Sequence, residues 1–367
     1  MIKAGSRSAR AAVVALAIGM AALVTGCGHP KPSTTHGGAA ASSASPASTP
    51  RAAGTVPLTA TTPGPDGRLI ADVSIGGKTL KVLVDTGSTG LRVVADKVPS
   101  SAVQKIGPKP AGGGSFGSGT QTTGDLAKAV VHLGSYQTSG PIPIELVTGS
   151  TCAQNHPNCP AANGKKPEMF GGQYDGILGI GVQSAGQGLV NPLWRLQGGI
   201  GRTFAIHYDP AGKSSLLLGV PAAGYTEVKL QTERSRANKP SSTGTPPSKG
   251  SDVPPPWNPR IPACFTLATL PGGKTCEPTM FDTGTPTLKI ETSDTPAGQV
   301  PANTTVGLST ARGRWSHTYT TGPSLQAHLA GSAASAGAGS AFAGLPAYAS
   351  VDVRYDLATG TIGFHSR

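Results

Sequence analysis

The sequence predicts an all-β protein made of two similar halves, and three observations lead to this expectation. Of its 367 residues, 52 are glycine and 33 are proline, while only 13% are charged. Short runs rich in Val, Ile, Leu and Thr recur between these turn-forming residues, as in KTLKVLVDTG and KSSLLLGVP, which is the pattern of short β-strands. One such run, together with the turn that follows it, occurs twice in the chain.

The first residues predict an export signal. A basic region precedes an apolar run over 11–24, which is short beside the roughly 20 residues of a membrane span. The run ends on Val24-Thr25-Gly26-Cys27, which resembles the lipobox of bacterial lipoproteins. Residues 1–26 are therefore expected to be a lipoprotein signal peptide, with lipid attached to Cys27; the alternative is an ordinary signal peptide with an incidental cysteine. The expected location is extracytoplasmic, lipid-anchored to the bacterial cell membrane or envelope.

Two further segments are expected to be flexible. Residues 27–65 are dominated by Ala, Ser, Thr, Pro and Gly, so they cannot bury a core and are predicted to form a disordered tether. This tether has few of the apolar and basic residues that an inhibitory pro-segment needs, so none is expected. Residues 232–262 are polar and rich in proline, which predicts a flexible surface insertion.

Besides Cys27 the chain has four cysteines, an even number that in an exported protein predicts two disulfides. Three pairings are possible, and the local pairs Cys152–Cys159 and Cys264–Cys276 are the simplest. The competing interpretation is a metal site built from Cys152, His156 and Cys159, which lacks a fourth ligand nearby in the sequence. No metal is expected.

The chain is basic, with a formal net charge of +12. Its Lys and Arg residues are scattered, and no nucleic-acid recognition motif accompanies them. We therefore expect no nucleic-acid binding, and interpret the charge as a solvated surface close to an anionic membrane.

The internal repeat carries the chemistry. VLVDTGSTGLRV (82–93) can be laid over TMFDTGTPTLKI (279–290) without a gap. The copies share Asp-Thr-Gly, then a hydroxyl residue, then Leu followed by a basic and a β-branched residue. Each copy also has a downstream apolar-apolar-Gly segment, Ile177-Leu178-Gly179 or Phe342-Ala343-Gly344. Turn preferences alone explain one Asp and Gly after a strand, but not this paired arrangement.

Two aspartates brought together suit general acid–base hydrolysis. Carboxylates forced close together cannot both ionise, so they share one proton. The ionised group takes a proton from water while the protonated group donates to the carbonyl oxygen under attack. The predicted catalytic pair is Asp85 and Asp282. The neighbouring glycines would let the two loops approach, the threonines would bond across to the opposite loop, and the next hydroxyls would hold the carboxylates. These supporting residues are Thr86, Gly87, Ser88, Thr283, Gly284 and Thr285.

With these motifs the chain resembles the pepsin family of aspartic peptidases, from about Asp66 to the C-terminus. The first half is also similar to exported bacterial proteins that share DTGSxGLR and a downstream GILG. The pepsin resemblance implies an all-β, bilobal pepsin-like acid protease fold, with two pseudo-symmetric β lobes and the active site in the cleft between them. The lobes are expected over 66–225 and 226–367.

The same resemblance implies a flap that closes over substrate. Phe116, Gly117, Ser118 and Gly119 resemble the tip of that hairpin, although Phe116 stands where the family usually has Tyr. A plain Gly/Ser loop is the alternative.

The expected function is that of a monomeric aspartic endopeptidase, without a cofactor, which hydrolyses peptide bonds of exported or cell-surface proteins. The alternative is a catalytically inactive pepsin-fold protein that binds a peptide, glycan or protein partner. Retention of both Asp-Thr-Gly loops favours the enzyme, whereas the phenylalanine flap and a short second lobe favour the binding protein.

Overall fold

The computed structural model describes residues 52–61, 67–107, 116–154, 156–157, 159, 161, 173–186, 188–233, 253–292, 297–310, 312–331 and 339–367. Nearly all regular structure in this part of the chain is β, which confirms the all-β prediction. Its helices are short 3₁₀ turns, and none is long and apolar enough to cross a membrane. They are η1 (Ala95–Lys97), η2 (Ser100–Ala102), η5 (Leu193–Arg195), η6 (Gln197–Arg202), η7 (Pro271–Gly273) and η8 (Leu345–Tyr348). The predicted signal peptide and Cys27 lie outside the described residues.

The larger of two sheets contains most of the first half of the chain. Its strands are β1 (Gly54–Ala60), β2 (Leu69–Ile75), β3 (Lys78–Asp85), β4 (Thr89–Val94), β5 (Gln104–Gly107), β6 (Thr120–Ala129), β7 (His132–Leu133), β8 (Tyr136–Gln137), β9 (Ile142–Cys152), β10 (Gly176–Ile180), β11 (Thr203–His207), β12 (Ser214–Leu218), β13 (Thr226–Lys229), β22 (Val351–Asp356) and β23 (Thr361–Ser366). Their order is β13-β23-β22-β11-β12-β1-β2-β3-β10-β4-β9-β6-β5, with β7 attached to β2 and β8 to β7.

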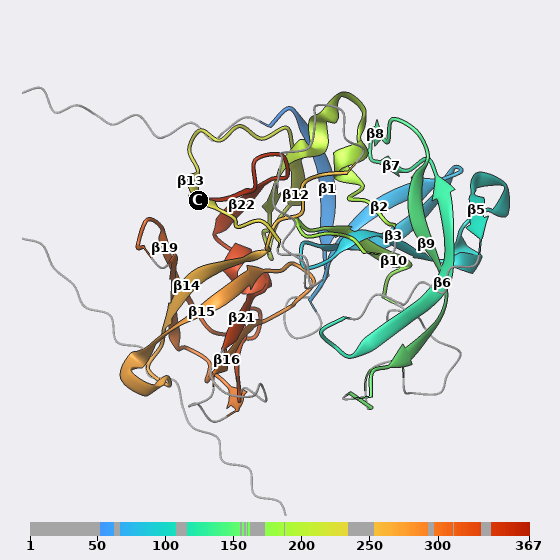
Figure 1. Cartoon of the computed structure of the whole chain (residues 1–367). Coiled ribbons are helices and arrows are strands. Elements are labelled where there is room, and N and C mark those ends of the chain that lie inside the picture. The colour runs from blue at the N-terminus through green and yellow to red at the C-terminus, as the bar shows by residue number, and fades with distance from the viewer. Residues whose placement is uncertain are drawn as a thin grey trace, which may run out of the picture. The chain divides into compact units, whose positions relative to one another are not determined.

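The smaller sheet comes from the second half. Its strands are β14 (Arg260–Thr266), β15 (Lys274–Phe281), β16 (Leu288–Thr292), β17 (Gly298–Gln299), β18 (Thr305–Thr310), β19 (Ser316–Thr320), β20 (Ala327–Gly331) and β21 (Ser340–Ala343). They run in the order β17-β20-β16-β21-β15-β14-β18-β19. In Figure 1 β14, β15, β16 and β21 gather in one group, apart from β2, β3, β6 and β9 of the larger sheet.

The sequence repeat is also a structural repeat. In the larger sheet β3 pairs parallel with β10, and β10 pairs antiparallel with β4. In the smaller sheet β15 pairs parallel with β21, and β21 pairs antiparallel with β16. Each apolar-apolar-Gly strand therefore lies between the strand that leads into an aspartate and the strand that leaves its loop, and the two sheets are the cores of two similar lobes.

The division between lobes at residues 225 and 226 needs a correction. β22 and β23 come from the end of the chain, yet they pair with β11 and β13 in the larger sheet. Residues 351–355 of β22 are all buried, so this strand needs covered faces and a neighbour at each edge. The larger sheet supplies both, and sequence order alone does not specify which sheet a strand joins.

The tether predicted over 27–65 is too long. Residues 54–60 form β1, which pairs with β12 and β2. Val56 and Leu58 point into the core, while Thr55, Pro57 and Thr59 face outward. This alternation of two apolar residues is enough for a half-buried strand, although the surrounding Ala, Ser and Thr composition hides it. Residues 27–51 and 62–65 lie outside the described part of the chain.

The flexible insertion predicted over 232–262 is also too long at its C-terminal end. β14 already begins at Arg260, and the residues just before it are anchored by Trp257. The Trp257 Nε1–H donates to the Leu357 carbonyl oxygen at 2.9 Å. Its ring lies so close to Gly360 that a Cβ there would be 2.3 Å from Trp257 Cδ2. Trp257 therefore fixes the end of the insertion, while 234–252 lie outside the described residues.

Both disulfides join the local cysteine pairs. Cys152 and Cys159 have Cα atoms 5.5 Å apart, and Cys264 and Cys276 stand opposite each other on β14 and β15. Because both sulfurs of the first pair are used in the disulfide, Cys152 and Cys159 do not form the metal site considered as the alternative. Among the described residues, no group of three or more His, Cys, Asp or Glu side chains is placed to hold a metal ion.

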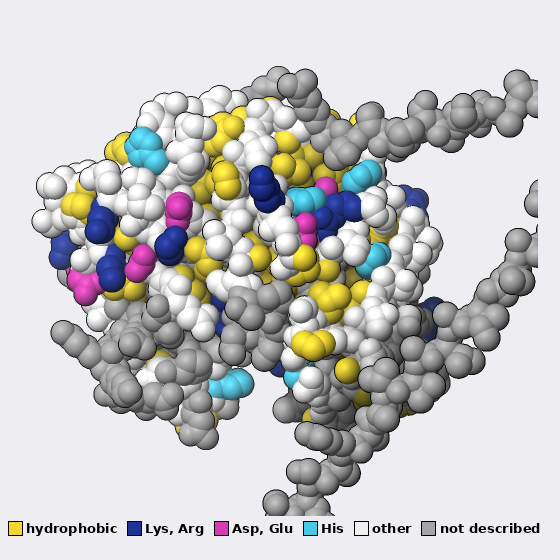
Figure 2. All heavy atoms as spheres, turned by 180° about the vertical axis from the view of Figure 1, so that it is seen from behind, with side chains coloured by type: hydrophobic (Ala, Val, Ile, Leu, Met, Phe, Trp, Pro, Cys, Tyr) yellow, Lys and Arg dark blue, Asp and Glu magenta, His cyan; other side chains and the backbone are white. Residues whose placement is uncertain are grey.

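Charges of both signs are mixed on the surface drawn in Figure 2. There, Lys and Arg side chains lie beside Asp and Glu side chains instead of forming a field of one sign. On this face, at least, the basic net charge is dispersed.

Candidate active site

The two aspartates of the repeat lie at equivalent ends of two strands. Asp85 is the last residue of β3, and Asp282 follows directly after β15. Both are buried, with 6% of Asp85 and 8% of Asp282 exposed. Side chains of this kind are rarely buried without partners, so the contacts around each carboxyl group define the site.

The loop after each aspartate holds its carboxyl group with two hydrogen bonds. The Gly87 N–H donates to Asp85 Oδ1 at 2.7 Å, and Ser88 Oγ donates to Asp85 Oδ2 at 2.5 Å. The second loop repeats this pattern through the Gly284 N–H (2.8 Å) and Thr285 Oγ1 (2.6 Å). Each carboxyl group is thus fixed at both oxygens by the residues that the repeat singled out.

The threonines lock the two loops together. The Thr86 N–H donates to Thr283 Oγ1 at 3.1 Å, and the Thr283 N–H donates to Thr86 Oγ1 at 3.0 Å. Each hydroxyl then donates to a backbone carbonyl of the opposite strand: Thr86 to Phe281 O (2.9 Å) and Thr283 to Val84 O (2.7 Å). Because all four bonds cross between the lobes and are buried, they join the two halves of the site rigidly.

The glycines allow the carboxyl groups to reach the opposite loop. A Cβ on Gly87 would lie 2.5 Å from Cγ of Asp282, and a Cβ on Gly284 would lie 2.6 Å from Oδ1 of Asp85. Real side chains do not tolerate such distances, so any other residue at either position would push the aspartates apart.

The carboxyl group of Asp282 has an unusual pKa. Burial, the charge of Asp85 and a hydrogen bond between the two carboxyl groups raise the pKa of Asp282 to about 7. The hydrogen bonds from Thr285 and Gly284 oppose this shift but do not cancel it. The pair therefore keeps a proton up to near-neutral pH, as expected for two buried carboxyl groups in contact.

Two buried tyrosines support the site from behind, and sequence reasoning missed them. The hydroxyls of Tyr348 and Tyr355 lie 2.8 Å apart. Tyr348 Oη is 3.3 Å from Thr86 Oγ1, and Tyr355 Oη donates to Phe281 O at 3.1 Å. Burial raises the pKa of both phenols, so they remain neutral hydrogen-bonding groups. No local motif marks these tyrosines, because the atoms they bind come from distant loops.

A buried ion pair lies in the first lobe and was also missed. Arg92 occupies the basic position of the repeat, and its Nε lies 3.0 Å from Glu145 Oε2, although the two atoms are not aligned for a hydrogen bond. Thr122 Oγ1 donates to the other Glu145 oxygen at 2.9 Å, and Arg92 Nη1 donates to Thr89 O at 3.1 Å. The cation of the first repeat is thus neutralised within its own lobe.

The predicted flap residues form a tight turn that leads into β6. The Phe116 N–H donates to Thr120 O at 2.9 Å, and the Gly119 N–H donates to Phe116 O at 2.8 Å. The Phe116 ring packs against Ile70, Leu83 and Ile177, on the Asp85 side of the larger sheet. This contact places the turn over the face of the larger sheet that carries Asp85, and its role as a flap stays a prediction.

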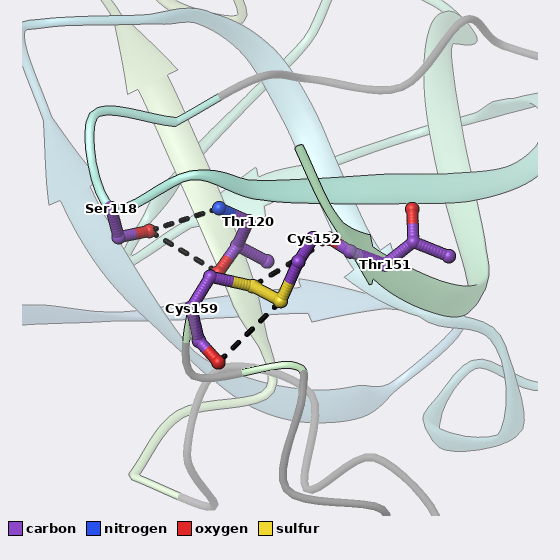
Figure 3. The surroundings of a disulfide bond; sticks show 5 residues. All are labelled: Ser118, Thr120, Thr151, Cys152 and Cys159. Atoms are coloured by element: carbon purple, nitrogen blue, oxygen red, sulfur yellow. Dashed lines mark hydrogen bonds between the residues drawn. A yellow bond between two sulfur atoms is a disulfide. The ribbon is translucent and has the colours of Figure 1, made fainter. Parts of the chain in front are cut away.

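The first disulfide is attached to the same turn. Figure 3 shows Cys152–Cys159 next to Ser118 and Thr120, where Ser118 Oγ lies 3.2 Å from Thr120 Oγ1. The Ala153 N–H also donates to Gly119 O at 2.8 Å. The loop that the disulfide closes therefore packs against the glycine turn and limits how far it can move.

Comparison with known proteins supports the class of the site. Residues 54–229 match the family model described as the PE-PGRS C-terminal aspartyl peptidase-like domain. The matched residues include the first aspartate loop. No curated protein sequence matches the chain significantly. Among solved structures, the aspartic proteinase from Irpex lacteus is similar with a TM-score of 0.53 and 16% identity, over 85% of this chain and 97% of that one. The chain thus has a pepsin-like fold, as predicted, and the two matches together support an aspartyl peptidase-like protein.

Proposed function

We propose that the protein is an aspartic endopeptidase whose catalytic pair is Asp85 and Asp282. The observation that carries this proposal is the pair of interlocked loops, which hold each buried carboxyl group against the opposite loop. Burial and the charge of Asp85 raise the pKa of Asp282 there to about 7. A structural turn has no need of two buried acids that share a proton, because that arrangement costs stability. Acid–base hydrolysis does need it.

The mechanism follows from the shared proton. The ionised carboxylate takes a proton from a water molecule held between the aspartates, and the water oxygen attacks the carbonyl carbon of the peptide bond. The protonated carboxyl group donates its proton to the carbonyl oxygen as that carbon becomes tetrahedral. The C–N bond then breaks as the leaving nitrogen receives a proton from one carboxyl group, while a hydroxyl of the tetrahedral intermediate gives its proton to the other carboxylate. The products are a carboxylic acid and an amine, and the pair again holds one proton.

We further propose that the protein acts outside the cytoplasm, on exported or cell-surface polypeptides. Two disulfides within a chain of this size support an oxidising location. The expected signal peptide and lipidation of Cys27 point the same way and remain part of the proposal.

Cleavage of a diverse peptide library tests this function, with wild type run beside Asp85→Asn and Asp282→Asn. The range from about pH 3 to 7 brackets a carboxyl pair that shares a proton. Each substitution keeps the size of the side chain but removes the titrating group, so cleavage should be lost in both. If well-folded wild type cleaves nothing at any pH, the proposal fails and the alternative of a pepsin-fold binding protein takes its place.

A further inference from the structure

Each aspartate is flanked by a row of side chains on its own face of the sheet. Because alternate residues of a strand share a face, Leu83 lies on the face of Asp85, and Met280 on the face of Asp282. The strand register extends each residue into a row that crosses four strands. The rows are Ile70, Leu83, Ile177 and Arg92 in the first lobe, and Arg260, Met280, Phe342 and Lys289 in the second.

The first-lobe row is apolar and covered. Ile70, Leu83 and Ile177 are buried, with Phe116 and Tyr174 packed over them. The one cation of this row, Arg92, is neutralised by Glu145 as described above. The first-lobe row itself is therefore apolar apart from a cation that is already paired, although Tyr174 above it is hydrogen-bonded to Arg68.

The corresponding second-lobe row is cationic and partly exposed. All four of its side chains are only partly buried. The Lys289 Nζ lies 2.7 Å from Oε1 of Glu291, and Ser340 Oγ donates to the other oxygen of that carboxylate at 2.6 Å. These hydrogen bonds lower the pKa of Glu291 although burial opposes them, so Lys289 and Glu291 form a closed ion pair.

Arg260 is the second cation of this row, and unlike Lys289 it is not paired with Glu291. Its guanidinium lies over the Phe342 ring, 4.8 Å from the centroid, and Nη1 donates to the carbonyl oxygens of Pro278 (3.1 Å) and Ala341 (3.2 Å). It forms no ion pair with any residue that the structure describes. Burial lowers the pKa of Arg260, while the charges of Glu291 and Asp282 oppose that shift. A partly dehydrated guanidinium of this kind is favourably neutralised by a carboxylate, which can bind two of its N–H groups at once.

We propose that the second-lobe row is a substrate subsite for an acidic side chain, with Arg260 binding the carboxylate of a Glu or Asp residue next to the scissile bond. Met280 and Phe342 contact the methylene groups of that side chain. This inference rests on the proposed peptidase function and names its substrate class: peptides with an apolar residue on one side of the bond and an acidic residue on the other.

The test compares peptide pairs that differ only by Glu or Gln at one position beside the scissile bond. We expect wild type at pH 6 to prefer the Glu peptide about tenfold in kcat/KM, the factor expected from one charge-assisted hydrogen bond. At pH 3 the preference should disappear, because the substrate carboxylate is protonated below about pH 4.3. The charges of Asp282 and Glu291 also act on Arg260, and Lys289 is ion-paired with Glu291. Asp282→Asn is therefore left out of this comparison, and each Glu/Gln ratio is taken within one variant at one pH.

The matched variants are Arg260→Met, Arg260→Lys and Lys274→Met. Arg260→Met should lower the Glu/Gln ratio of kcat/KM to about one, and Arg260→Lys should retain part of the preference for Glu. Lys274 is exposed at the far end of β15, so its replacement should leave the ratio unchanged. A Glu/Gln ratio near one in wild type on both sides of the bond, or an undiminished ratio in Arg260→Met, would overturn the subsite.

Binding of uncleavable peptides separates this inference from the proposed function. The same Glu and Gln peptides with a reduced bond at the cleavage position are titrated into wild type and Arg260→Met by calorimetry. If the Glu peptide binds about tenfold more tightly and only through Arg260, while nothing is cleaved, the subsite stands and the peptidase function fails. Cleavage without a Glu preference overturns the subsite alone, and the absence of both binding and cleavage overturns both.

Discussion

At the scale of single residues, the site depends on side chains that both donate and accept. Each of Thr86 and Thr283 accepts from the backbone N–H of the other and donates to a carbonyl of the opposite strand. A residue of the same shape without a hydroxyl would leave two buried backbone groups unpaired. The threonines therefore hold the two aspartate loops in place against each other.

Thr283→Val is expected to damage both stability and activity. It leaves the Thr86 N–H and the Val84 carbonyl without partners, at a cost of at least about 2 kcal/mol in the free energy of unfolding. The rate of cleavage should fall along with the stability, because the two loops lose two of the four hydrogen bonds that join them. Chemical denaturation and kcat are measured beside Thr305→Val, an exposed strand threonine used as control. Equal effects of the two substitutions would refute this role.

The pKa of Asp282 predicts a pH effect with a definite sign. Its folded value of about 7 lies above the ordinary carboxyl value of 3.8, so the folded protein holds this proton more tightly than the unfolded chain. The resulting stabilisation is complete below the unfolded pKa and is lost as the pH rises through about 7. The free energy of unfolding of wild type relative to Asp282→Asn should therefore be higher at pH 5 than at pH 8. A difference that stays constant between these pH values would contradict the assignment.

At the scale of secondary-structure elements, β1 shows how a strand can be hidden by its composition. Its inward residues are Val56 and Leu58, and its outward ones are Thr55, Pro57 and Thr59. Because β1 lies between β12 and β2, it connects two parts of the larger sheet.

Val56→Asp and Thr55→Asp test this strand as a matched pair. The first puts an unpaired charge into the core and should cost more than about 3 kcal/mol, whereas the second faces solvent and should cost less than about 1 kcal/mol. Thermal and denaturant unfolding measure the difference. Similar effects at both positions would mean that β1 is not a half-buried strand.

The ion pair between β4 and β9 leads to another prediction at this scale. Arg92 and Glu145 stand opposite each other on these strands, with 5% and 0% of their side chains exposed. Removing one charge leaves the other buried and unpaired, so Arg92→Met should destabilise the protein by about 3–5 kcal/mol. The double variant Arg92→Met/Glu145→Met removes both charges and should recover much of this loss. If the double variant loses as much free energy of unfolding as the two single variants together, the two side chains are not coupled.

At the scale of the whole molecule, the repeat explains why so much of the site could be predicted. The Asp-Thr-Gly loops carry their own hydrogen-bonding groups within three residues of each aspartate, and such local contacts are visible in a sequence. Tyr348 and Tyr355 could not be predicted, because they act on Thr86 and Phe281 from strands and turns far along the chain. The pairing of β22 and β23 with β11 and β13 was missed for the same reason, since the edge that a strand joins depends on burial in three dimensions.

The association of the two lobes is the basis of the proposed activity. Each lobe supplies one carboxyl group, one threonine and one glycine to a single site, so the proposed acid–base pair depends on both lobes. The first lobe adds an apolar row and the second adds Arg260, so the two sides of the catalytic pair differ in the substrate residues they suit.

Binding of a statine-containing peptide is the most direct test of the central claim that Asp85 and Asp282 form one peptide-binding acid–base pair. Its hydroxyl group imitates the tetrahedral carbon formed when water attacks, so transition-state complementarity predicts tight binding by the intact pair. Calorimetry at pH 5 should show binding by wild type and a loss of about 100-fold or more in both Asp85→Asn and Asp282→Asn, the range typical of such analogues. Equal affinity in wild type and in either asparagine variant would show that the two carboxyl groups do not act as this pair.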